Sequence, residues 1–144
     1  MAVSNSGASA VSREVEMRIL LPSGGSQAIP SQLDYRVEDP FAVRATFGSA
    51  GASVTWVFAR DLLQEGTVRP SGDGDIRVLP VQRDGSPLVR LELSSPDGRA
   101  VIEAPLPAIQ EFLAESFNAL PAGQEWRHLY FDQELADLLK DDFA

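Results

Sequence analysis

The sequence predicts a single α+β domain whose strands form antiparallel meanders, with the helices packed on one side of the sheet. The chain has 144 residues, which is the size of one ordinary domain. Apolar residues recur at every second position over most of the chain, which is the period of a half-buried strand. Only short turns separate these runs, and short connections favour antiparallel pairing. The predicted element order is ββββα-βββα-α, and runs of strands closed by helices are typical of the α+β class.

Four strands and a short helix are predicted in the first half of the chain. The strands fall where apolar and polar residues alternate, at residues 13–21, 32–37, 41–47 and 54–58. In the fourth strand Val54, Trp56 and Phe58 share one face, so we expect Trp56 to be buried and structural. The helix at residues 59–65 contains good helix formers, and Gly66 stands where a C′ glycine closes a helix.

Three strands and two helices are predicted in the second half. Apolar residues at alternate positions place the strands at residues 76–80, 89–93 and 100–104. The turn Pro96-Asp97-Gly98 joins the last two strands. A helix opens at Pro105 and Pro107, where proline is tolerated in the first turn, and runs to Leu120. A last helix starts near Asp132, which is a good N-cap.

The ends of the chain bound the domain. Residues 1–12 are small and polar and predict a poorly ordered N-terminal extension, which leaves residues 13–144 as one domain. The N-terminus lacks the basic and apolar regions of a secretory signal. No run of 18 apolar residues occurs, so we expect no membrane span and a cytoplasmic location.

The residue inventory argues against catalysis. The chain has no cysteine, which excludes thiol catalysis and zinc–cysteine sites, and its one histidine, His128, excludes a two-histidine metal site within one chain. No nucleophile and base stand in a recognisable arrangement. The loop Asp73-Gly74-Asp75 lacks the further ligands of a calcium site. We therefore expect no catalytic residue, no metal and no cofactor, and a protein that binds rather than reacts.

Net charge disfavours nucleic acid as the ligand. The chain has 12 basic and 21 acidic residues, and its formal net charge of -9 repels phosphates. Five arginines are expected on the outer face of the sheet and keep a single-stranded nucleic-acid binder as the alternative function: Arg36, Arg44, Arg77, Arg83 and Arg90. Asp34 and Glu92 lie among them, so a mixed, solvated face is the favoured interpretation.

A run of residues near the middle of the chain is distinctive. The segment Trp56-Val57-Phe58-Ala59-Arg60-Asp61-Leu62-Leu63-Gln64-Glu65-Gly66 closely resembles the central motif of the SsgA-like proteins, the sporulation and cell-division regulators of actinobacteria. Weaker matches follow the same order along the chain, at Asp34-Tyr35, Asp39-Pro40-Phe41-Ala42-Val43, Arg69-Pro70, Gly72-Asp73-Gly74-Asp75, Leu93-Ser94-Ser95-Pro96 and Glu103-Ala104-Pro105. The resemblance spans about residues 14–140.

The resemblance implies a function and an assembly. It implies a cytoplasmic protein without enzymatic activity that helps to choose septum sites. The implied partners are the division GTPase FtsZ, which is recruited to the septum, and another SsgA-like protein. The implied fold is similar to the Whirly-type single-strand nucleic-acid binders and forms a homotrimer, and this fold analogy is the source of the nucleic-acid alternative. Subunit contacts are also one way to cover the edges that short meanders leave open.

The short helix after Trp56 is our candidate partner-binding element. Its charged and polar residues Arg60, Asp61, Gln64 and Glu65 are expected to face outward, with Leu62 and Leu63 packed inward.

Overall fold

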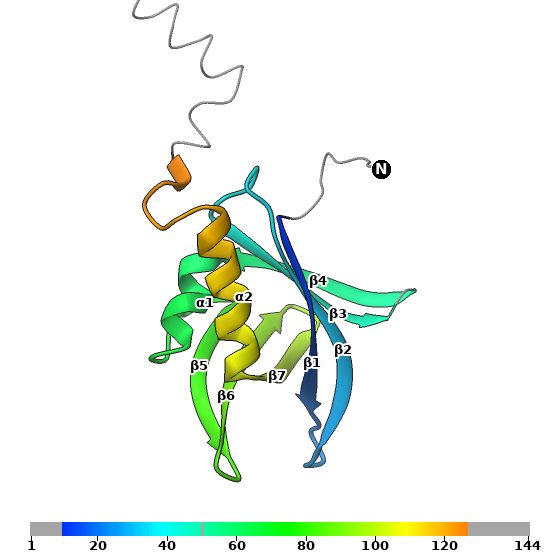
Figure 1. Ribbon diagram of the computed structural model, residues 1–144. Coiled ribbons are helices and arrows are strands. Elements are labelled where there is room, and N and C mark those ends of the chain that lie inside the picture. Colours follow the sequence, from blue (N-terminus) through cyan, green and yellow to red (C-terminus); the bar gives the residue numbers. More distant parts are fainter. Residues whose placement is uncertain (1–9, 50, 127–144) are drawn as a thin grey trace, which may run out of the picture.

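The computed structural model describes residues 10–49 and 51–126, which form one seven-stranded sheet and two helices (Figure 1). The strands are β1 (Val11–Leu20), β2 (Ser26–Tyr35), β3 (Ala42–Ser49), β4 (Ala52–Ala59), β5 (Ile76–Arg83), β6 (Ser86–Ser95) and β7 (Gly98–Pro105), and the helices are α1 (Arg60–Gly66) and α2 (Leu106–Ala119). The strand order is β4-β3-β2-β1-β7-β6-β5, and every neighbouring pair is antiparallel. The α+β prediction is therefore confirmed.

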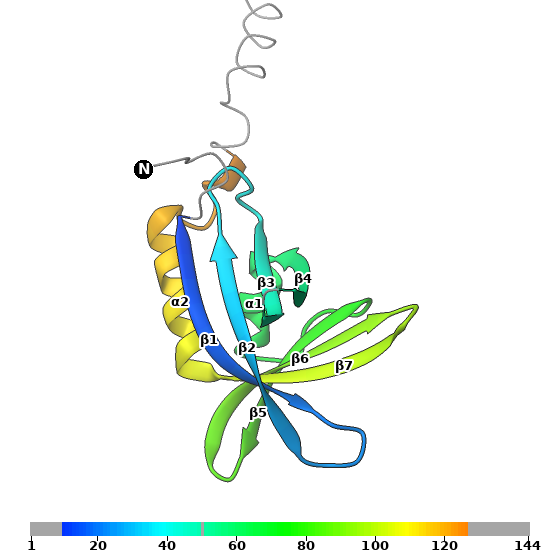
Figure 2. The ribbon, with the colours of Figure 1, turned by 90° about the vertical axis from the view of Figure 1, so that its right-hand side faces the viewer.

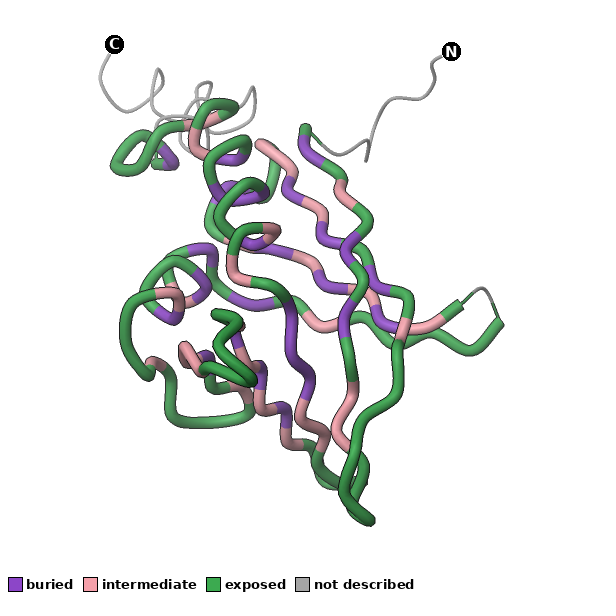
Figure 3. The backbone as a smooth tube through the Cα atoms, turned by 60° about the horizontal axis from the view of Figure 1, so that its bottom comes forward, coloured by how far each residue is buried: buried purple, intermediate pink, exposed green. Residues whose placement is uncertain are grey.

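Both helices pack on the same face of the sheet, as predicted. α2 contacts β1, β6 and β7, while α1 contacts β4 and β5. Leu63 of α1 and Ile109, Phe112 and Leu113 of α2 belong to one core cluster with the inward residues of the strands. Figure 3 shows these buried positions alternating with exposed ones along the strands. The period-two pattern of the sequence therefore identified the buried face correctly.

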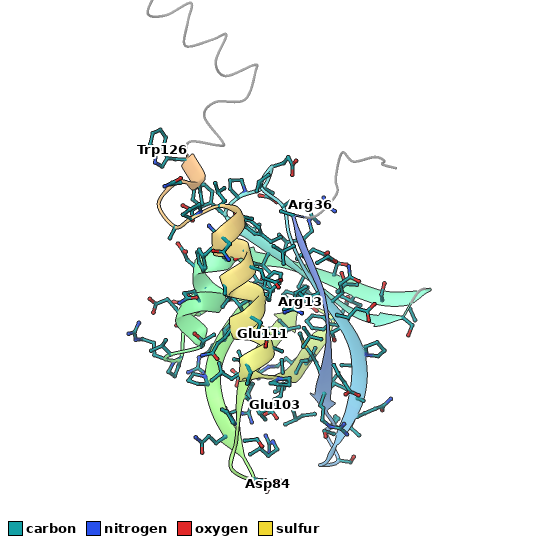
Figure 4. The ribbon with its side chains drawn as sticks, in the orientation of Figure 1. Arg13, Arg36, Asp84, Glu103, Glu111 and Trp126 are labelled. Carbon is teal, nitrogen blue, oxygen red and sulfur yellow. The ribbon has the colours of Figure 1, made fainter. Side chains whose placement is uncertain are left out.

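An ion-pair cluster fixes α2 across β1. The guanidinium of Arg13 lies 2.9 Å from Glu111 Oε1 and 3.2 Å from Glu115 Oε1 (Figure 4). The two carboxylates lie on neighbouring turns of α2, so one arginine of the strand holds both. These side chains are substantially exposed, so their attraction contributes only modestly to stability.

β2 and β5 extend beyond their predicted bounds, and each has a proline inside the strand. β2 extends back to Ser26 because it pairs with β1 over its whole length. β3 pairs only with residues 31–34, so Pro30 lies in a part of β2 that has no neighbouring strand on the β3 side. β5 continues past Pro80 because it is an edge strand. It ends at the two-residue turn Asp84-Gly85, whose φ angles of 54° and 82° are those of a type I′ hairpin.

The sheet divides into two halves at the contact between β1 and β7. These strands pair at Arg18↔Glu103 and Ile19↔Ile102. Beyond this contact the β1–β2 hairpin and the β5–β6 hairpin diverge, which Figures 1 and 2 show from two directions. The outer face at the junction is therefore open between the hairpins.

The prediction that Trp56 is buried and structural is confirmed only in part. Trp56 is half-buried and packs at the margin of the core, and its neighbour Val54 is 58% exposed, whereas Phe58 is 6% exposed. The three side chains share a face, as the alternation indicates. The reason for the difference is position in the sheet: β4 is an edge strand, and the helices cover only its Phe58 end.

Gly66 closes α1 for a different reason from the one predicted. It is the last residue of the helix, and the capping residue Thr67 is right-handed, with φ -77° and ψ -14°. A Cβ atom built on Gly66 would lie 2.2 Å from Val78 Cγ1 and 2.4 Å from Val78 Cβ. Glycine is therefore required because α1 lies against β5, and not because the backbone adopts a left-handed conformation.

Three features of the sequence analysis lie outside the described residues. They are His128, the helix expected near Asp132, and residues 1–9 of the predicted N-terminal extension. The last part of that extension is described: β1 begins at Val11 and includes Ser12, and the N–H of Ala10 donates to the carbonyl of Tyr35 at 2.8 Å. The ordered domain thus begins before the predicted boundary at residue 13.

We expect Gly66→Ala to destabilise the fold by about 1–3 kcal/mol, because the new methyl group overpacks the contact with Val78. Chemical denaturation of the wild type and the variant measures this cost. Adding Val78→Gly removes both side-chain atoms that clash, Cγ1 and Cβ, so Gly66→Ala should cost less in that background. An equal cost in both backgrounds would show that helix propensity or capping, and not the close approach, dictates glycine here.

Candidate protein-binding surface

Arg60, the first residue of the expected binding element, lies in the core, so that part of the prediction is wrong. Only 1% of Arg60 is exposed. Its Nη2 donates to Glu125 Oε2 at 2.8 Å and its Nη1 donates to the carbonyl of Ser116 at 3.0 Å. Its guanidinium carbon lies 4.5 Å from the ring centroid of Tyr35 and 4.0 Å from that of Phe117. Arg60 is therefore a structural residue and not a surface contact.

The position of Arg60 in the chain explains its burial. It is the first residue of α1, and its backbone N–H donates to the carbonyl of Phe41 at 2.7 Å. This bond fixes the turn from β4 into α1, so the side chain projects toward α2 and the segment that follows α2. Sequence periodicity cannot reveal this, because a charged residue at a helix start is usually solvated.

The partner of Arg60 is also buried. Glu125 is 6% exposed, and its Oε1 accepts a hydrogen bond from the backbone N–H of Gly123 at 2.8 Å. Burial alone would raise the pKa of Glu125, but the hydrogen bond from Arg60 and the backbone N–H groups outweigh it and lower that pKa. The carboxylate is therefore held ionised at neutral pH, and the ion pair joins the chain after α2 to the start of α1.

The remaining members of the expected element do lie at the surface. Asp61, Gln64 and Glu65 are exposed on α1, while Leu63 is buried and Leu62 is half-buried. The carboxylate of Glu65 is paired with Arg69 one turn later. Whether this face binds a partner stays a prediction.

The edge strand β4 is an apolar feature that the sequence analysis did not single out, and no strand of the described residues pairs with its outer side. β4 forms one end of the strand order, and its residues 52–59 carry no charged side chain. Val54 is 58% exposed, Val57 is 50% exposed, and Phe41, which precedes β3, is 47% exposed. We call Phe41, Val54, Trp56 and Val57 the β4 edge surface. The signal in the sequence was a strand of eight successive residues without a charged residue or a proline. Charged residues and prolines are what usually protect an edge strand from pairing with another chain.

A shallow cavity lies beside the β4 edge surface. It has a volume of about 250 Å³ and lies between Trp56 and the turn that joins β6 to β7, with Leu93 and Ala100 in its apolar lining and Arg99 at the same site. An added strand uses the backbone groups of an edge for affinity and nearby pockets for specificity. This part of the molecule thus offers a free edge and an adjacent pocket for one apolar side chain.

The arginines that kept nucleic acid as an alternative are largely matched by carboxylates. Arg77 lies 3.3 Å from Glu92, and Arg83 and Arg90 lie 2.7 and 2.8 Å from Glu103. Burial raises the pKa of Glu103, but hydrogen bonds from the two arginines outweigh burial and lower it. This pairing leaves no continuous basic stripe of the kind that a phosphate backbone requires, so nucleic-acid binding lacks structural support.

The described part of the chain contains no group of three or more histidine, cysteine, aspartate or glutamate side chains placed to hold a metal ion. None of its helices is long and apolar enough to cross a membrane.

Similarity to known proteins identifies the family. A family model described as "Streptomyces sporulation and cell division protein, SsgA" matches residues 29–125. The chain belongs to the SsgA-like family. SsgB of Streptomyces coelicolor, a sporulation-specific cell division protein, is 46% identical over 132 residues, which are 91% of this chain and 96% of SsgB. The family resemblance of the Trp56–Gly66 segment is therefore confirmed.

Solved structures of SsgA-like proteins have the same fold. An SsgA-like sporulation-specific cell division protein of Thermobifida fusca matches with a TM-score of 0.82 and 37% identity over 94% of this chain and 99% of that one. A structure described as "Mutations in SsgB correlate to longitudinal cell division during sporulation of Streptomyces coelicolor" matches with a TM-score of 0.78 and 47% identity, over 82% of this chain and 94% of that one. These SsgA-like relatives carry the names of division proteins and not of enzymes.

We expect Arg60→Ala to cost about 3–5 kcal/mol of unfolding free energy, because it leaves the buried carboxylate of Glu125 without its cation. Denaturant unfolding measures the loss. The matched control is Arg69→Ala, which removes an exposed pair and should cost less than about 1 kcal/mol. The double variant Arg60→Ala, Glu125→Ala should be more stable than the sum of the single losses predicts. Additive losses would contradict a buried, coupled pair.

Acid should destabilise the protein through Glu103 and Glu125. Both have a pKa lower in the folded state than the ordinary value of 4.5. A carboxylate with a lowered pKa contributes its full stabilisation above its unfolded-state pKa of about 4.5. That stabilisation is lost as the pH falls through the pKa of the folded state. We therefore expect the unfolding free energy to fall below about pH 4.5. Glu103→Gln should be less stable at pH 7 and should lose less stability between pH 5 and pH 3 than the wild type. An identical pH profile for the variant would exclude Glu103 as a source of the acid sensitivity.

Proposed function

We propose that this protein acts in sporulation-specific cell division as a non-catalytic, protein-binding component that recruits FtsZ to the septum. The observation that carries the proposal is membership of the SsgA-like family, whose named relatives are sporulation-specific cell division proteins. The expected partners, FtsZ and another SsgA-like protein, come from this family relationship. A homotrimer and a location at the septum belong to the same proposal.

The β4 edge surface is the contact that we propose for FtsZ. The net charge of -9 gives this chain no long-range attraction to a partner unless that partner is basic. An uncharged edge avoids this difficulty, because strand addition relies on backbone hydrogen bonds and apolar side chains. Val54 and Val57 are exposed on opposite faces of that edge strand, so a strand added along β4 would have an exposed valine to contact on each face. The exposed residues Asp61, Gln64 and Glu65 of α1 follow β4 directly and extend this contact.

Co-sedimentation with FtsZ polymers tests the proposal. We expect the wild type to enter the pellet with FtsZ, and Val54→Lys and Val57→Lys each to weaken that binding at least tenfold, because a lysine on an edge strand opposes strand addition. Both valines are at least half exposed, so the substitutions should cost little stability. The matched control is Val68→Lys, because Val68 is 63% exposed but lies after α1 and outside the β4 edge surface.

The outcomes separate the partner from the surface. If the wild type stays in the supernatant and a fluorescent fusion is diffuse while septa form, recruitment of FtsZ is wrong for this protein. If the wild type binds and all three lysine variants bind equally well, FtsZ is the partner but the β4 edge surface is not the contact. Light scattering on each variant verifies that the assembly has the same size as that of the wild type.

A further inference from the structure

A small pocket lies on the outer face of the sheet, at the junction between β1 and β7. It has a volume of about 210 Å³, and it is formed where the β1–β2 and β5–β6 hairpins diverge (Figure 2). Its walls come from both halves of the sheet: Glu16, Arg18, Ser26, Arg83, Leu88, Glu103 and Pro105. The β4 edge surface is at the end of the sheet, three strands away from β1, so an inference about this pocket does not depend on the function proposed for that surface.

Two arginines on opposite sides of the pocket are held in place within the protein. Arg83 donates from Nε and Nη2 to the two oxygens of Glu103, at 2.9 and 2.7 Å. Arg18 donates from Nε to the hydroxyl of Ser26 at 2.7 Å and from Nη2 to its carbonyl at 3.3 Å. Both guanidinium groups are thus oriented before a ligand arrives, which reduces the entropy lost on binding.

The pocket lining holds two arginines, Arg18 and Arg83, and two carboxylates, Glu16 and Glu103. Glu103 is 5% exposed and accepts hydrogen bonds from both Arg83 and Arg90, so its charge is already matched within the protein. Glu16 is exposed, and Asp84 also lies close enough to Arg83 to act on its charge. Within the described residues, the Nη1 groups of Arg18 and Arg83 donate no hydrogen bond to a protein acceptor. These donors remain available to an anionic ligand, in a protein that is acidic as a whole.

The lining indicates what kind of anion fits. The planar guanidinium group of an arginine matches the planar geometry of a carboxylate. Leu88 and Pro105 supply an apolar wall, which suits a ligand with a hydrocarbon stem. The pocket is smaller than the range of about 300 to 1,000 Å³ that is usual for small-molecule and cofactor sites. Its size and chemistry therefore match one acidic side chain.

We infer that this pocket binds a glutamate side chain from an acidic segment of a partner protein, with the carboxylate between Arg18 and Arg83. The stem of that side chain lies against Leu88 and Pro105. Binding is a charge-assisted hydrogen-bonding contact, so it weakens as salt concentration rises.

Fluorescence anisotropy with a labelled hexaglutamate peptide tests this inference on the full chain at low salt. We expect binding of hexaglutamate and no binding of the matched hexaglutamine peptide. Arg18→Gln and Arg83→Gln should each weaken hexaglutamate binding about tenfold, because each removes a charge-assisted hydrogen bond. Arg18→Gln leaves the pairs of Glu103 intact, and in Arg83→Gln the carboxylate keeps Arg90, so both variants are expected to fold. Thermal melts of each variant verify this.

The matched control is Arg77→Gln. This substitution also removes one positive charge from the sheet, but Arg77 pairs with Glu92 and lies outside the pocket. It should change the affinity for hexaglutamate less than twofold. An equal loss in all three variants would indicate diffuse electrostatic attraction and overturn the inference, as would equal binding of hexaglutamine or no binding of hexaglutamate. Displacement of the peptide by equimolar inorganic phosphate would assign a small-anion site instead. Tighter, Arg18-dependent binding of a labelled oligonucleotide would assign a nucleic-acid site.

Discussion

The buried guanidinium of Arg60 is the interaction on which the arrangement of the helices depends. It contacts the ring of Tyr35 on β2, the carbonyl of Ser116 and the ring of Phe117 on α2, and the carboxylate of Glu125 beyond α2. One side chain of α1 thus joins the sheet, the second helix and the segment that follows it. Because a buried ion pair is strongly destabilised when only one partner is removed, these elements are energetically coupled. The fold therefore holds its helices together by a polar centre inside an otherwise apolar core.

This polar centre leaves one side of the molecule uncovered. α1 begins where β4 ends, and α1 and α2 meet around Arg60, so the helices cover the end of β4 that carries Phe58. The other end of β4 extends beyond them, which leaves Val54 exposed and Trp56 half-buried. The free apolar edge is thus a consequence of how the helices are fixed. The family motif, which is one continuous run from Trp56 to Gly66, therefore has two physical parts. The first is an edge strand that is largely exposed, and the second is a helix whose first residue is buried.

The sequence predicted the fold well but misplaced Arg60 of the candidate site and the cover over Trp56, for reasons that particular residues show. Alternation identified the strands because it shows which face of the sheet a side chain occupies. It carries no information on what covers that face, so it could not show that Trp56 is only half-buried. Arg60 was placed outside because its partner Glu125 is 65 residues away, and no local pattern connects them. The end of β5 was misjudged at Pro80, although Asp84-Gly85 is a strong hairpin signal. Gly66 was recognised as important, but its close contact with Val78 is tertiary.

The two contacts that we propose differ in the charge of their side chains. At the β4 edge the side chains are uncharged, so binding there is insensitive to the net charge of -9 that the chain carries. At the junction of β1 and β7, Arg83 and Arg90 pair with Glu103 and Arg18 lies opposite, so guanidinium donors are concentrated there in a molecule that is acidic as a whole. The two surfaces lie in different parts of the sheet and do not compete for residues. An acidic partner, which the overall charge repels, would therefore meet uncharged side chains at the β4 edge and the guanidinium groups of Arg18 and Arg83 at the junction.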